Sequence, residues 1–157
     1  MAIEDDIYFL QRVPTLRLLG NEALRILAIG AETRYVHKGE VLFVVGEAAD
    51  CGYVIQEGSF RLDTRSRLAA DVIVGAGTLL GELALIAETK RPATATASEP
   101  STVIRIPRTL FLKMLEGYPD AAQRLRDHLA HRAEQTAKDI FAVRTALDPG
   151  PGPGQQG

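Results

Sequence analysis

The pattern of hydrophobic and polar residues divides the chain into a helical first part, a β-rich middle and a helical last part. Over residues 5–30 apolar side chains recur at helical spacing, and Pro14 interrupts the pattern. Asn21 stands where its side chain would cap a second helical segment. We therefore predict short helices over residues 5–30.

Between residues 34 and 107 the helical period gives way to short runs rich in β-branched and aromatic residues. The predicted strands cover residues 41–45, 53–55, 60–62, 72–74, 93–97 and 103–106. Turns are predicted at Gly39, Gly46, Gly52, Gly58, Gly75 and Gly77. Many short strands with regular glycine punctuation predict a sandwich, barrel or roll.

The helical period returns over residues 108–147, first in residues 110–115 and then in a long segment whose first turn holds Pro119. Its stripe alternates spacings of four and three, as in a coiled-coil seam, and comprises Ala122, Arg126, Leu129, Ala133, Thr136, Ile140, Val143 and Leu147. Two interpretations stay open: a homodimer through residues 122–147, or a lid folded back on the roll. Residues 148–157, rich in Pro, Gly and Gln, are predicted to be a disordered tail.

Composition and charge narrow the class of protein. A chain of 157 residues with 46% hydrophobic and 24% charged residues suits one folded domain. The formal net charge of -2 and the lack of a Lys/Arg cluster predict no direct nucleic-acid partner. Cys51 is the only cysteine, the N-terminus lacks the features of a secretory signal, and charges interrupt every apolar run. We therefore expect a cytoplasmic domain without a disulfide or a membrane segment.

A glycine, a glutamate and an arginine between two predicted strands carry the most informative chemistry. Gly81 permits close backbone approach to a ligand, and the next residues can form a short turn whose N–H groups face an anion. The planar guanidinium of Arg91 can donate two parallel hydrogen bonds to a phosphate. The Glu82 carboxylate accepts only, which suits a sugar hydroxyl. Singly, these residues are a helix-opening turn and a solvated charge; together they favour a phosphate site.

The spacing of these residues is similar to that of a known family. The segment Gly81-Glu82-Leu83-Ala84-Leu85-Ile86, with Arg91 ten positions after the glycine and Ala93-Thr94 closing it, resembles the phosphate-binding cassette of cyclic-nucleotide-binding domains. Upstream matches are Lys38-Gly39-Glu40, Phe43, Gly46-Glu47, Asp50, Tyr53, Ile55 and Gly58. The resemblance implies an α+β fold: an antiparallel, jelly-roll-like β-roll (34–107) with short N-terminal helices (5–30) and C-terminal helices (108–147), forming one domain over residues 1–147.

The resemblance also implies a role for each residue of the site. Arg91 would bind the cyclic phosphate and Glu82 the ribose 2′-hydroxyl. Val72 and Val74 would form apolar walls for the base. The whole expected ligand-binding set is Gly81, Glu82, Leu83, Ala84, Arg91, Pro92, Ala93, Val72 and Val74, with backbone N–H groups of Leu83, Ala84 and Ala93 in the phosphate cradle.

Three positions depart from the family pattern: Leu80, where an aromatic residue is common, Ala49, where glycine is common, and Pro92, where alanine, serine or threonine is usual. The first two are packing variations. Pro92 has neither a hydroxyl nor an N–H, so one contact to the phosphate or to a guanine is missing. We therefore expect cyclic AMP as the ligand, with cyclic GMP binding more weakly.

The histidines and the cysteine are not expected to bind a metal or to take part in catalysis. His128 and His131 lie three positions apart on the long helix, away from His37, so we expect exposed helix histidines and no metal site. Cys51 is expected to be a small turn residue, and no catalytic residue is assigned. Residues of the long helix, with Arg124, Arg126 and Arg132 as candidates, are expected to cap the base or to form a solvated face.

The sequence therefore predicts a sensor, not an enzyme. In the leading hypothesis a cyclic nucleotide rearranges the C-terminal helix and so regulates an unidentified effector protein or fused domain. The alternative is a degenerate roll that binds no nucleotide and serves as a dimerisation or docking module. A transcription regulator would need a helix-turn-helix after the long helix, and the sequence ends before one is expected.

Overall fold

The computed structural model describes residues 3–64 and 70–147, with side chains described as far as residue 135. The helices are α1 (Ile3–Gln11), α2 (Pro14–Arg17), α3 (Asn21–Gly30), the 3-10 turn η1 (Leu83–Leu85), α4 (Arg108–Gly117) and α5 (Pro119–Leu147). The strands are β1 (Glu32–Val36), β2 (Val41–Phe43), β3 (Ala48–Ala49), β4 (Cys51–Glu57), β5 (Ser59–Asp63), β6 (Val72–Gly75), β7 (Leu79–Leu80), β8 (Thr89–Lys90), β9 (Thr94–Ala97) and β10 (Ser101–Pro107).

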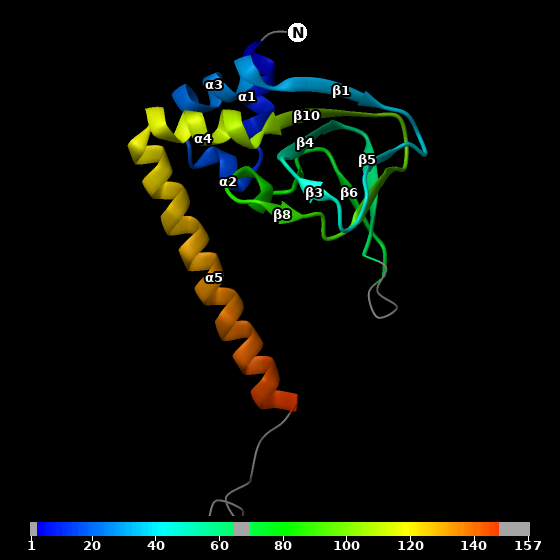
Figure 1. Ribbon diagram of the computed structural model, residues 1–157, viewed down its shortest axis with the longest axis vertical. Helices are drawn as coiled ribbons and strands as arrows, with labels where there is room; N and C mark the ends of the chain where they lie inside the picture. Colours follow the sequence, from blue (N-terminus) through cyan, green and yellow to red (C-terminus); the bar gives the residue numbers. More distant parts are fainter. Residues whose placement is uncertain (1–2, 65–69, 148–157) are drawn as a thin grey trace, which may run out of the picture.

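The strands form an antiparallel roll, as predicted. One sheet has the order β1-β10-β4-β7, the second has the order β2-β9-β5-β6, and β3 pairs with β8. The helices α1, α3 and α4 lie together at the end of the first sheet, while α5 runs away from the roll (Figure 1). The α+β fold expected from the sequence is thereby confirmed.

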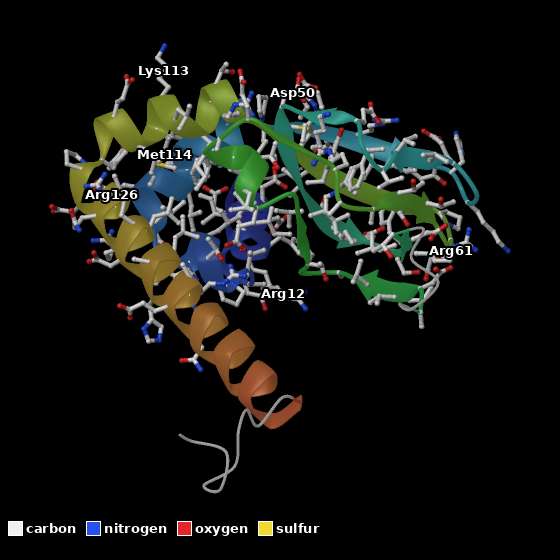
Figure 2. All side chains as sticks on the ribbon, turned by 60° about the horizontal axis from the view of Figure 1, so that its bottom comes forward. Arg12, Asp50, Arg61, Lys113, Met114 and Arg126 are labelled. Atoms are coloured by element: carbon white, nitrogen blue, oxygen red, sulfur yellow. The ribbon has the colours of Figure 1, made fainter. Side chains whose placement is uncertain are left out.

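Two hydrophobic clusters hold these layers together, and β4 contributes to both. Tyr53 and Ile55 belong to the cluster inside the roll, whereas Val54 belongs to the cluster under the helices. Successive residues of a strand face opposite sides, so a strand between two cores is apolar throughout. On α4, Met114 is buried against the helical cluster and Lys113 points away from the molecule (Figure 2).

Two predicted residue roles and the predicted start of the roll were wrong. Asn21 does not cap α3; it is the first helical residue, and Gly20 holds the N-cap position. Gly52 lies inside β4, where it pairs with Ile106 of β10, so it is not a turn residue. Gly75 ends β6 and does begin a turn, because its carbonyl accepts a hydrogen bond of 3.2 Å from the Thr78 N–H. The roll begins at Glu32, two residues before the predicted start, because β1 pairs with β10 from Glu32 onward.

Among the residues whose side chains are described, the first turns of the long helix α5 pack on the rest of the molecule. Ala121 and Leu125 are buried in the helical cluster, and Leu129 packs against it. Ala122 is also buried, so the first part of the predicted coiled-coil stripe faces this chain's own core. Ala133 is exposed. The side chains of Ile140, Val143 and Leu147, and the predicted tail 148–157, lie outside the described residues.

Candidate functional site

The predicted anion site begins with a bend at Gly81, between β7 and η1. Its φ angle is +82°, a left-handed conformation that favours glycine. A Cβ at this position would collide with Nη1 of Arg91 and lie 3.1 Å from the Cys51 carbonyl oxygen. Two independent features therefore favour glycine at position 81: the backbone conformation and the close approach of the Arg91 side chain.

Arg91 is a buried cation that has no carboxylate partner in the described part of the chain. Its side chain is buried and its exposed fraction is 4%. The guanidinium lies 4.4 Å from the Phe43 ring centre and 5.5 Å from that of Tyr53, and Nη2 lies 3.3 Å from the Cys51 sulfur. Nη1 is buried and makes no hydrogen bond to any described residue. Because burying an unpaired charge is costly, this arrangement is suited to an anion that Nη1 can bind.

The backbone of Arg91 is held as firmly as its side chain. Its N–H donates to the Glu47 carbonyl and its carbonyl accepts from the Gly46 N–H, both at 2.8 Å. Nearby, Thr94 accepts a hydrogen bond of 2.9 Å from the Val45 N–H. The backbone that carries the guanidinium is therefore anchored on both sides of Arg91.

A pocket of about 230 Å³ opens next to this arginine. It is lined by Ala49, Gly81, Glu82, Leu83, Ala84, Thr89, Lys90, Arg91 and Pro92. The structure thus brings the cassette residues expected from the sequence, Gly81 to Ala84 with Arg91 and Pro92, to one hollow. The backbone of η1 uses some of its own donors, because the Ala84 N–H donates to the Gly81 carbonyl at 3.1 Å.

The remaining expected residues lie outside the lining of this pocket. Ala93 is buried behind Pro92. On β6, Val72 is 55% exposed, and Val74 packs partly against the roll cluster. Leu83, at the pocket itself, is 60% exposed. These exposed apolar side chains are available to a flat aromatic group, but their role as base walls stays a prediction.

Glu82 faces away from Arg91 toward α5. Its carboxylate pairs with Nη1 of Arg132 and accepts a hydrogen bond of 3.2 Å from the Thr15 hydroxyl. It lines both the Arg91 pocket and a second hollow of about 370 Å³, whose other polar members include His128 and Arg132. This link between the cassette and α5 was not found in the sequence, because its partners are 50 and 67 residues away.

The other two candidate arginines of α5 have local partners. Arg124 donates to the carbonyls of Leu18 (2.6 Å) and Leu19 (3.2 Å), so it fastens α5 to the end of α2. Arg126 bonds to Gln123 one turn earlier and lies on the side of α5 away from the roll (Figure 2). Neither contacts the pocket residues in this conformation.

Cys51 was wrongly predicted to be a turn residue. It opens β4 and is buried beside Arg91, because its strand pairs with the end of β10. Burial, and next the hydrogen bond with Cys51, raises the pKa of Tyr53. On α5, His131 is exposed and His128 is partly buried at the second hollow. Over residues 3–64 and 70–147 no group of three or more His, Cys, Asp or Glu side chains is arranged to hold a metal ion.

Comparisons with known proteins agree with this geometry. The family model described as the cyclic nucleotide-binding domain matches residues 33–118, more than half of the chain. A solved cyclic nucleotide-binding-like protein from Brucella abortus is 40% identical, with a TM-score of 0.64, and the match covers 71% of this chain and 98% of that one. The N-terminal domain of a transcriptional regulator from Streptomyces coelicolor is 27% identical, with a TM-score of 0.76 and coverage of 84% and 94%.

The matches to curated sequences are partial. A cAMP-dependent protein kinase regulatory subunit from Yarrowia lipolytica is 28% identical over 107 residues, which are 68% of this chain and 28% of the relative. The chain spans 7% to 19% of the length of other curated relatives, which include fungal lysophospholipases named NTE1. No helix within the described residues is both long and apolar enough to cross a membrane. From the family match and the cassette around Arg91, the chain belongs to the cyclic nucleotide-binding domain family.

Proposed function

We propose that the domain is a sensor that binds a cyclic nucleotide, preferentially cyclic AMP, through Arg91 and Glu82. The observation that carries the proposal is the buried, unpaired Nη1 of Arg91 beside the pocket. A cyclic phosphate carries one negative charge and would supply the missing partner. Each charge-assisted hydrogen bond contributes about 1.5–3 kcal/mol net, which is enough to hold a phosphate.

The second contact of the ligand would be shared with α5. A ribose 2′-hydroxyl donating to Glu82 would compete with Arg132 for the same carboxylate. The Arg132 side chain is 54% exposed, and an ion pair of that kind contributes only about 0–1 kcal/mol. A bound nucleotide can therefore displace it, and the part of α5 that follows its packed first turns would then change position.

This exchange of partners gives the domain an output. Occupancy would be converted into a change in the position of α5, which a protein effector or a fused domain would detect. The kinase regulatory subunit among the relatives is named for dependence on cAMP, which supports the choice of ligand. Pro92 lines the pocket and offers neither a hydroxyl nor an N–H to a guanine.

The alternative is a degenerate roll that acts as a ligand-free dimerisation or docking module. The pairing of Glu82 with Arg132 and Thr15 favours it, because the ribose contact is already occupied. The unpaired Nη1 of Arg91 argues against it, because a buried cation destabilises a roll that never binds an anion. The cost of that cation makes nucleotide binding the stronger proposal.

Calorimetric titration with cyclic AMP and cyclic GMP tests the proposal. We expect saturable binding of cyclic AMP, and at least tenfold weaker binding by the Arg91→Ala variant. Lys113→Ala is the control, because Lys113 is an exposed cation on α4 and does not line the pocket. If the folded wild-type protein bound neither nucleotide, the sensor proposal would be wrong and the docking module would stand.

A further inference from the structure

A second arginine, Arg108, holds the backbone that surrounds the proposed phosphate site. It is the first residue of α4, and its Nη1 contacts three carbonyl oxygens: Ala49 at 3.0 Å, Ala87 at 3.0 Å and Ala84 at 3.4 Å. Its backbone N–H donates to the Asp50 carbonyl at 2.8 Å. One residue therefore joins the end of η1, the end of β3 and the start of α4.

The three carbonyl contacts are the interactions that stabilise Arg108 at the start of α4. A cation in the first turn of a helix is repelled by the positive end of the helix dipole. Among the described residues Arg108 forms no ion pair with a carboxylate, in contrast to Arg34, Arg61 and Arg105. Its stabilising partners are the backbone oxygens of Ala49, Ala84 and Ala87.

Two of those oxygens belong to residues of the Arg91 pocket. Ala49 and Ala84 both line the pocket, and both are buried. The 3-10 turn η1 has only three residues, and a turn of that length has little stability of its own. Its stability must therefore come from tertiary contacts: Leu85 is buried in the helical cluster, and Arg108 binds the carbonyls of Ala84 and Ala87 at the carboxyl end.

We propose that Arg108 is a positioning residue that fixes η1 against β3 and thereby sets the affinity of the pocket for its ligand. The affinity part of this inference rests on the proposed function. The positioning part does not, because it concerns the free protein. No ligand contact is assigned to Arg108, which acts on the pocket from behind its wall.

The test compares Arg108→Met with Arg124→Met. Methionine keeps the apolar stem and removes the donors. Arg124 is a matched control, because it too is a helix arginine that donates to backbone carbonyls, those of Leu18 and Leu19, away from the Arg91 pocket. We expect Arg108→Met to raise the Kd for cyclic AMP about tenfold and Arg124→Met to change it less than twofold.

Conservative replacement gives a signature that a merely structural residue would not show. Because all three carbonyls converge on one nitrogen, the ammonium of Arg108→Lys, with three N–H donors, should restore most of the affinity. Arg91→Lys should restore little, because a lysine lacks the two parallel donors that a phosphate takes. If Arg108→Met does not fold, Arg108→Gln, which keeps a polar but uncharged side chain, takes its place with the same expectation.

Amide hydrogen exchange of the free protein provides the ligand-independent readout. We expect residues 82–88 to exchange at least about tenfold faster in Arg108→Met and unchanged in Arg124→Met. Unchanged exchange in Arg108→Met would overturn the inference, and so would faster exchange with an unaltered Kd. If wild-type protein binds no nucleotide, the proposed function fails, and hydrogen exchange alone decides whether Arg108 positions η1.

Discussion

The buried charge of Arg91 destabilises the ligand-free protein, because its desolvation is not compensated by a carboxylate. We therefore expect the ligand-free Arg91→Met variant to be at least as stable as the wild type. Replacing a buried ion pair by apolar side chains of similar volume is neutral or stabilising by about 1–4 kcal/mol, and a buried cation that lacks a carboxylate has at least as much desolvation cost to lose. The variant loses the cation–π contacts with Phe43 and Tyr53, which contribute about 0.5–2 kcal/mol. At the middle of both ranges, a gain of about 2.5 kcal/mol less a loss of about 1.3 kcal/mol leaves the variant more stable by about 1 kcal/mol in its free energy of unfolding.

The ligand should reverse this order. Cyclic AMP at about 100 times its Kd adds about 2.7 kcal/mol to the stability of a protein that binds it. The wild type should gain that amount, and the variant, without its phosphate donors, should gain almost nothing. The two unfolding curves should therefore exchange places when the nucleotide is added.

Chemical denaturation with and without cyclic AMP measures both effects at once. Lys113→Met is the control, because it removes an exposed cation on α4 outside the pocket and should change neither curve by more than about 0.5 kcal/mol. The reasoning would be refuted if Arg91→Met lost more than about 1 kcal/mol in the free state, or if cyclic AMP still stabilised it.

Three further predictions follow from α5 and from Pro92. Arg132→Ala should strengthen cyclic AMP binding by up to about fivefold, because it frees the Glu82 carboxylate, whereas Arg126→Ala on the same helix should leave the affinity unchanged. Equal Kd values for the two variants in a titration would show that the Glu82–Arg132 ion pair does not affect binding. Pro92→Thr should narrow the preference for cyclic AMP over cyclic GMP in a competition assay, and an unmoved ratio would place selectivity elsewhere. Light scattering should show self-association through residues 122–147 that Ala133→Glu weakens; a monomer at high concentration would favour the lid.

The sequence by itself determined the features whose signals are local. Helical periodicity located α4 and α5, and β-rich runs between glycines located most strands of the roll. The cassette from Gly81 to Arg91 was also readable, because the residues that form it are close along the chain. The structure places Gly81 and Arg91 in the lining of one pocket, as their spacing predicted.

Tertiary structure decided everything that depends on residues far apart. The two-residue strands β3 and β8 exist only because they pair with each other, and no periodicity can mark so short a run. Cys51 reads as a turn residue until β4 places it beside Arg91. The partners of Glu82 and the carbonyls held by Arg108 lie 21 to 67 residues away along the chain. Such contacts leave no local pattern, because chain folding alone brings their members together.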